Sequence, residues 1–186
     1  MRENRTNRTV KILVYGAALT AMAVVLGRVT AFYPAPGAKY TLDKFAIFMS
    51  GMFLGPAMGS MVGFLADLLG GLLFGQGWTP WLCIPAVLYG LFGGLFRHML
   101  AKKHFYPRLM LAYLFPVVIG SILIQSPILA ATYNPGTFWA DTLLKLSSRT
   151  IQFAIMWVIE VQLIYFLIKT SIFDRIGLWN SGKDAK

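Results

Sequence analysis

Apolar residues are gathered into six stretches along the chain, and short polar or proline-containing segments separate them. A helix needs about 20 mainly apolar residues to cross the ~30 Å hydrocarbon layer of a bilayer. The pattern therefore predicts an all-α integral membrane protein, in which residues 1–186 form a single six-helix membrane domain with basic terminal tails. The predicted spans are residues 10–32, 41–54, 57–74, 82–100, 109–131 and 146–168.

Residues 51–74 carry a regular spacing of small side chains. Glycine occupies every fourth position from Gly51 to Gly63, and Asp67 takes the next position in the series. Beyond the break that Pro56 introduces, these positions lie on one face of a helix. Small residues let neighbouring helices approach closely, and a carboxylate among them must face protein or a wet cavity. This face is therefore predicted to point toward other helices and away from lipid.

The composition agrees with a membrane protein, because 57% of the residues are hydrophobic and the mean hydropathy is +0.64. Soluble domains are about half apolar, and six spans leave little of the chain for a soluble catalytic domain. The single cysteine, Cys83, excludes an internal disulfide. The sequence has no phosphate-binding G-x-x-x-x-G-K-[ST] motif and no His-rich or paired-acid motif of an intramembrane enzyme. We expect no catalytic residues, no metal site and no cofactor.

The formal net charge of +10 comes from basic residues at both ends and in one loop, which does not resemble the basic face of a nucleic-acid-binding protein. With six spans, these three segments lie on the same side of the membrane. The positive-inside rule identifies that side as cytoplasmic, so both termini are predicted to be cytoplasmic. The basic residues are Arg2, Arg5, Arg8, Lys11, Arg97, Lys102, Lys103, Arg108, Lys169, Arg175, Lys183 and Lys186.

Several polar side chains fall inside the predicted spans, where an ionisable group is costly unless it is paired or faces a wet cavity. All of them lie at a similar depth, near the outer ends of the first, third, fifth and sixth spans. They are Arg28, Asp67, Gln125, Lys145, Arg149 and Gln152. The last three are spaced i, i+4 and i+7 and share one helix face. We predict that these residues form a ligand-binding site just below the outer surface.

Two interpretations of this cluster stay open. Asp67 forms a structural ion pair with Arg28 or Arg149, or an anionic ligand matches the surplus of cations and its carboxylate binds the planar guanidinium groups. Glu160 lies deeper in the last span without an evident neighbour, and its role stays undecided. The aromatic residues of the outer segments are either an interfacial belt or stacking partners for a ligand. The candidates for stacking are Trp78, Trp81 and Tyr133.

A buried acid, several cations and aromatic side chains suit a flat heterocycle with an acidic tail. Folates, which are pterins with a glutamate tail, have this chemistry. The acid would accept hydrogen bonds from the ring amino group, the aromatic rings would stack on the heterocycle, and the cations would hold the tail. Thiamine is cationic and riboflavin has no carboxylate, so both are weaker alternatives. A structural subunit without a ligand would not need three cations at one depth.

The segment from Gly55 to Gly70 reads G-P-x-x-G-x-x-x-G-x-x-A-D-x-L-G, and it lies in a six-span protein of this size. In both respects the chain resembles the substrate-binding S components of energy-coupling factor (ECF) transporters, and the segment is similar to the folate-specific members. The resemblance implies capture of folate or a related vitamin outside the bacterial cytoplasmic membrane. It also implies that a transmembrane coupling subunit and two ATPase subunits drive the transport.

Further expectations follow from this resemblance. S components carry a small-residue A-x-x-x-A surface on the first span that docks onto the coupling subunit, and Ala17 and Ala21 match it, although small residues also serve helix packing. The outer segments 33–41 and 74–81 would act as lids over the pocket. The depth and chemistry of the polar residues, apart from the resemblance, lead us to expect that Asp67 binds the pterin edge. The residues expected to bind the tail or a ring oxygen are Arg28, Lys145 and Arg149.

Overall fold

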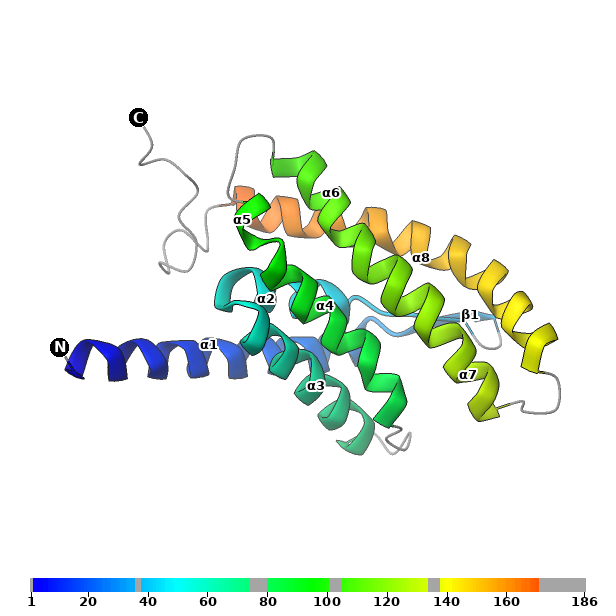
Figure 1. Cartoon of the computed structure of the whole chain (residues 1–186), viewed down its shortest axis with the longest axis horizontal. Helices are drawn as coiled ribbons and strands as arrows, with labels where there is room; N and C mark the ends of the chain where they lie inside the picture. Colours follow the sequence, from blue (N-terminus) through cyan, green and yellow to red (C-terminus); the bar gives the residue numbers. More distant parts are fainter. Residues whose placement is uncertain (1, 36–37, 74–79, 101–104, 134–137, 171–186) are drawn as a thin grey trace.

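The structure is a computed structural model that describes residues 2–35, 38–73, 80–100, 105–133 and 138–170. Most of this part of the chain is helical, and the helices form a bundle that includes one short β-hairpin (Figure 1). In chain order the elements are α1 (Arg2–Val29), β1 (Phe32–Ala35), β2 (Ala38–Tyr40), α2 (Asp43–Leu54), α3 (Pro56–Leu73), the 3-10 helix η1 (Pro80–Cys83), α4 (Ile84–Leu95), α5 (Arg97–Leu100), α6 (Phe105–Pro116), the π-helix η2 (Val117–Ile124), α7 (Gln125–Tyr133) and α8 (Phe138–Lys169).

Four helical segments of the described chain are long and apolar enough to cross a membrane. Large apolar side chains remain exposed on them, as expected for a surface that meets lipid. The predicted helical membrane fold is confirmed in this respect. The four segments are Thr9–Val29 in α1, Pro56–Leu73 in α3, Phe105–Ala131 through α6, η2 and α7, and Arg149–Lys169 in α8.

The other two predicted spans differ from the structure. The stretch 41–54 forms α2, which has 12 residues and is therefore about 18 Å long at 1.5 Å per residue. Residues 45–53 of α2 are all buried, so this helix is enclosed by its neighbours. The stretch 82–100 is divided between η1, α4 and α5. The length of an apolar stretch in the sequence therefore did not distinguish a short, enclosed helix such as α2 from a helix that spans the membrane.

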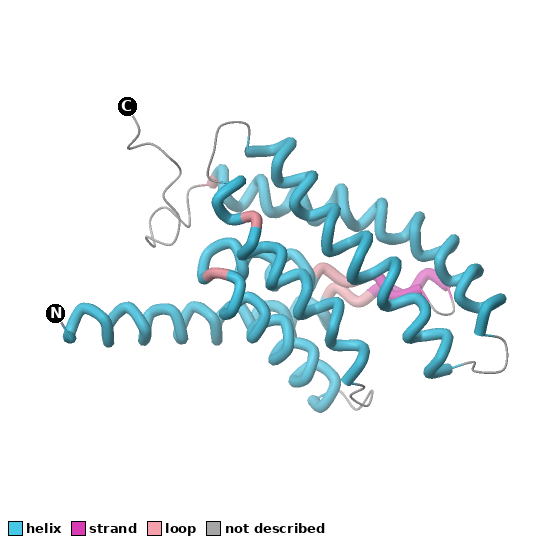
Figure 2. The backbone as a smooth tube through the Cα atoms, in the orientation of Figure 1, coloured by secondary structure: helices cyan, strands magenta, loops and turns pink. Residues whose placement is uncertain are grey.

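The segment after the first span, expected to be a turn-rich loop, instead contains the antiparallel hairpin β1–β2. Phe32 pairs with Tyr40, and Ala35 pairs with Ala38. The strand β2 lies against α8, so this hairpin connects the end of α1 to the start of α2 across the last helix. Figure 2 shows the hairpin in magenta among the helices.

Glycines let the backbones of α2, α3 and α4 approach to contact distance. A Cβ atom added at Gly51 would lie 2.0 Å from the carbonyl oxygen of Gly90. One added at Gly90 would lie 2.0 Å from the carbonyl oxygen of Gly59, and one at Gly63 would lie 2.3 Å from that of Ala86. No side chain fits at such distances, since real Cβ contacts essentially never fall below 3.0 Å. The glycine face of α3 points toward other helices, as its spacing predicts.

The helix between Phe105 and Tyr133 changes its hydrogen-bonding pattern in the middle. The backbone N–H of Gln125 donates to the carbonyl of Gly120, five residues earlier, at the end of the π-helix η2. Pro127 has no N–H to continue an ordinary ladder, so a local π-helix near it is compatible with its chemistry. The wider π-turn rotates the residues that follow relative to those before it, which sets the direction of Gln125.

The last helix, α8, packs along α6 and α7 (Figure 2). Two polar contacts join α8 to α6. Trp157 Nε1 donates to a backbone carbonyl of α6 at 3.1 Å. The Tyr113 hydroxyl donates to Glu160 Oε2 at 2.7 Å, and both side chains are buried. The rings of Phe48 and Tyr89 pack on Tyr113, with centroid distances of 4.8 and 5.4 Å. Residues from four helices thus meet around this tyrosine.

Replacing Gly90 with alanine is expected to destabilise the protein, because the new Cβ would overlap the backbone of α3. Overpacking of this kind typically costs about 1–3 kcal/mol, or more where backbone must move. Gly70 is the matched control, since nothing lies within 4 Å of its Cβ position; an exchange for alanine there should be neutral or slightly stabilising. Thermal unfolding of both purified variants in detergent tests the difference. Equal melting temperatures would contradict the close packing.

Candidate ligand-binding site

A polar cavity of about 160 Å³ lies where α2, α3, α7 and α8 meet. Most of its wall is charged or amide side chains, which is unusual in the interior of a membrane protein. Five of the residues come from α8, and the others come from α3, from α7, from the start of α2 and from Thr41 just before it. The wall consists of Thr41, Asp43, Lys44, Asp67, Gln125, Arg149, Gln152, Phe153, Met156 and Glu160.

The contribution of α8 follows from its helical repeat. Arg149, Gln152, Phe153, Met156 and Glu160 are spaced so that they fall on one face of the helix. Gln152 and Glu160 are almost fully buried, with 4% and 2% of their surface exposed. The Arg149 guanidinium carbon lies 5.7 Å from the centroid of the Phe153 ring, a distance at which a cation is attracted to the ring face.

Several polar atoms of the wall have no hydrogen-bond partner among the described residues. They are the Nη1 atom of Arg149, the Oε1 atom of Gln125 and the Oε1 atom of Glu160, and all three are buried. Leaving a buried donor or acceptor unsatisfied costs about 1–3 kcal/mol, and more when the group is charged. Such atoms are rare in native structures and are expected to find a partner. A polar ligand in the cavity would supply that partner.

A second, apolar cavity of about 400 Å³ adjoins the first, and the two share Thr41 and Met156 as wall residues. The hairpin contributes Phe32 and Tyr40 to it, and α8 contributes Ile159. Ligand sites generally have volumes of about 300–1,000 Å³, so the polar cavity is small for such a site and the apolar cavity falls within this range. A polar cavity and an apolar cavity thus lie next to each other.

Four of the residues predicted to bind the ligand come together in the polar cavity: Asp67, Gln125, Arg149 and Gln152. They come from three helices. The sequence predicted that they lie at one depth in the membrane, and the structure brings them into one cavity. The structure adds Asp43, Lys44 and Glu160 to the wall. Asp43 and Lys44 lie 3.6 Å apart between Oδ1 and Nζ. The sequence could have indicated these two residues, because they lie at the outer end of a predicted span, at the same depth as the other polar residues.

The remaining predicted residues lie elsewhere or outside the described part of the chain. Arg28 Nη2 donates to the Gly70 carbonyl at 2.6 Å, which joins α1 to α3, and Arg28 is not in the wall of the polar cavity. Trp81 is exposed over 67% of its surface at the start of η1. Trp78 lies outside the described residues, as do the side chains of Tyr133, the last residue of α7, and Lys145 in α8.

No group of three or more His, Cys, Asp or Glu side chains in the described ranges is arranged to hold a metal ion. The chemistry of the cavity is instead that of hydrogen bonding and charge pairing. Carboxylates accept from N–H donors, and the Arg149 guanidinium and the Lys44 ammonium donate to carbonyl or carboxylate oxygens. The arrangement is suited to reversible binding of a polar molecule.

Residues 7–169 match the model of a family described as ECF-type riboflavin transporter, S component. Among solved structures, the chain is similar to the one in the crystal structure of FolT bound with folic acid. The two are 26% identical and superpose with a TM-score of 0.65, and the similarity covers 83% of this chain and 90% of that chain. No protein in the set of curated sequences matches the chain.

Proposed function

Because the chain belongs to the family of ECF-type riboflavin transporter S components, we propose that it captures folate from outside the cell and delivers it through an ATPase-driven coupling module. Membership of the family makes it a vitamin-binding, non-enzymatic subunit of a multi-pass membrane transporter. The choice of folate is the specific part of the proposal. The observation that carries it is the polar cavity, in which buried carboxylate, amide and guanidinium groups face one another.

The donor and acceptor pattern of the ligand ring favours a pterin. A pterin presents its 2-amino group and the neighbouring ring N–H side by side, and one carboxylate such as that of Asp67 accepts both hydrogen bonds. The adjacent ring carbonyl needs a donor, for which Arg149 is available in the same wall. The apolar cavity beside it suits the flat aromatic part of the molecule. The similarity to the structure of FolT with folic acid supports the same ligand class.

Riboflavin is the second candidate, because the family description names it. The polar edge of a flavin has a single N–H between two carbonyl groups. A carboxylate facing that edge would meet two acceptors for each donor, which is unfavourable in a buried site. The carboxylates of the polar cavity therefore favour folate over riboflavin.

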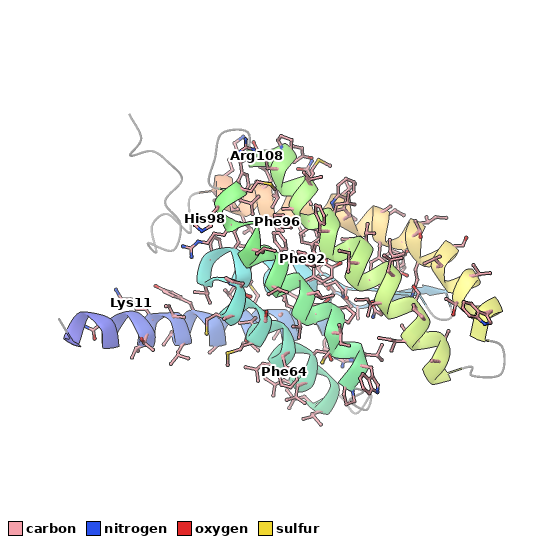
Figure 3. All side chains as sticks on the ribbon, in the orientation of Figure 1. Lys11, Phe64, Phe92, Phe96, His98 and Arg108 are labelled. Carbon is pink, nitrogen blue, oxygen red and sulfur yellow. The ribbon has the colours of Figure 1, made fainter. Side chains whose placement is uncertain are left out.

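We also propose an orientation in the membrane. In Figure 3, Lys11, His98 and Arg108 lie toward the same end of the molecule, and the positive-inside rule assigns this end to the cytoplasm. With this end in the cytoplasm, the start of α2 and the first half of α8, which line the cavities, lie toward the outer side of a bacterial cytoplasmic membrane. The hairpin borders the apolar cavity through Phe32 and Tyr40, so it is positioned to act as a lid.

The partner surface in this proposal is on α1. Ala17 and Ala21 are exposed, whereas Gly16 and Thr20 are buried, so the two alanines lie on the side of α1 that other helices leave open. Small side chains on an open helix face let another helix approach closely within a membrane. The proposed partner is the transmembrane coupling subunit, which is joined in turn to two ATPase subunits. Docking and ligand binding then use separate surfaces.

The purified protein, without ATP or partner subunits, is expected to bind folic acid with saturable heat in titration calorimetry. Riboflavin under the same conditions should bind at least roughly 100-fold more weakly, because the carbonyl groups of its polar edge would face the carboxylates of the cavity. Saturable binding of riboflavin together with no binding of folic acid would refute the choice of ligand while leaving the family assignment intact.

Replacing Arg149 with alanine or Asp67 with asparagine is expected to weaken folic acid binding by roughly 10- to 100-fold, the scale of one hydrogen bond to a charged group. Lys169→Ala is a matched control, because it removes an exposed cation at the other end of α8. Size-exclusion chromatography establishes that the variants stay folded. If both site variants bind like the wild type, the cluster is a structural network and the cavity is not the binding site.

The double variant Ala17→Trp, Ala21→Trp is expected to lose assembly with the coupling subunit while it keeps folic acid binding, because the large rings occupy the surface for close helix approach. Leu111→Trp is the control, since Leu111 is exposed on α6, a different helix. Co-purification with a tagged coupling subunit measures assembly. An intact complex of the double variant would count against docking at this surface.

A further inference from the structure

Glu160 is a buried carboxylate that the sequence left without a role. Only 2% of its surface is exposed, and it lies in the wall of the polar cavity. Its Oε2 atom accepts a hydrogen bond from the Tyr113 hydroxyl at 2.7 Å. Its Oε1 atom is buried and has no hydrogen-bond partner among the described residues. One oxygen of the group is thus held by the protein, and the hydrogen-bonding capacity of the other is unfilled among the described residues.

A structural role for Glu160 accounts for only half of this arrangement. Satisfying the Tyr113 hydroxyl requires one acceptor, which a neutral carboxamide or a hydroxyl would provide at lower cost. The nearby Tyr89 hydroxyl illustrates that solution, because it is paired with Ser121 Oγ at 3.0 Å. A carboxylate with a bare oxygen in the interior is expensive unless a donor approaches it. The cost is understandable if the donor is brought by a ligand.

The surroundings of Tyr113 keep the carboxylate in one orientation. The ring of Tyr113 is fully buried between the rings of Phe48 and Tyr89, so its hydroxyl has a fixed position in the core. The hydrogen bond from that hydroxyl fixes Oε2 and thereby the direction of Oε1. Preorganised acceptors of this kind lose less entropy when they bind a donor.

We propose that Glu160 is a ligand contact whose Oε1 atom accepts a hydrogen bond from an N–H group of the ligand, and that Tyr113 is the positioning residue that orients it. The inference rests on the proposed function, in that it takes the polar cavity as the vitamin site. It adds a second carboxylate to Asp67, on a different helix. The site therefore selects an amino-substituted heterocycle with N–H donors in two places, and Glu160 contributes to specificity as well as affinity.

The variant Glu160→Gln tests the contact, because it keeps the size of the side chain and removes its charge. Titration of the purified full-length protein with folic acid is expected to give binding roughly 10- to 100-fold weaker than the wild type. Gln162→Ala, at an exposed position of the same helix, should bind like the wild type. Wild-type affinity in Glu160→Gln, while the wild-type protein binds folic acid, overturns this inference alone. Absence of folic acid binding to the wild-type protein overturns the proposed function first.

Tyr113→Phe tests the positioning role and remains informative if Glu160→Gln does not fold. It removes the hydroxyl and leaves the carboxylate, so folic acid binding should weaken about 3- to 10-fold. A purely structural tyrosine would lower the melting temperature and leave the affinity unchanged, and that result overturns the role. Where both single variants fold, the double variant should bind no more weakly than Glu160→Gln alone, because Tyr113 acts through Glu160. Independent losses that multiply would contradict the assignment.

Discussion

The close backbone contact of α2, α3 and α4 is the interaction on which the rest of the structure depends. Gly51, Gly59 and Gly90 bring main-chain atoms of the three helices so near that no Cβ atom fits between them. Lipid is as apolar as the helix surface, so the hydrophobic effect does not drive helices together inside a membrane. Close van der Waals packing of this kind is a main source of helix association there. It encloses the short α2, whose residues 45–53 are buried, and it sets where the start of α2 lies relative to Asp67.

The helix α8 provides the side of the polar cavity that faces α2 and α3. Its polar face runs from Arg149 to Glu160 and is directed into the protein, while exposed residues such as Ile151 and Ile155 lie on its other faces. The tyrosine cluster around Tyr113 connects α8 to α2, α4 and α6 through ring packing and one hydrogen bond. The π-helix η2 ends at Ile124, and the next residue, Gln125, contributes its side chain to the wall. An irregular helix is therefore found next to the polar cavity, and π-helices are common at functional sites.

In the proposed site, two neighbouring cavities have different physical roles. The polar cavity provides groups whose hydrogen-bonding capacity is unfilled within the described protein, at Gln125, Arg149 and Glu160. The apolar cavity provides area under the β-hairpin. The proposed ligand, a pterin attached to an aromatic linker, is polar at one end and flat and apolar beside it. In this proposal, burial of the apolar part supplies affinity, and the donors and acceptors of the polar part supply specificity.

The sequence by itself determined the membrane class, the positions of most helices, the inward direction of the glycine face and the group of polar residues at one depth. Hydropathy indicates how deep a residue lies in the membrane, and the helical repeat indicates which face of its helix it occupies. The grouping of Asp67, Gln125, Arg149 and Gln152 was therefore predictable. Hydropathy and the helical repeat do not report which helices are neighbours or how each is rotated. Only the tertiary structure enclosed α2, brought Asp43 and Lys44 into the wall, gave Glu160 its partner Tyr113 and joined Arg28 to Gly70. These features depend on lateral packing between segments far apart in the chain, which no local pattern records.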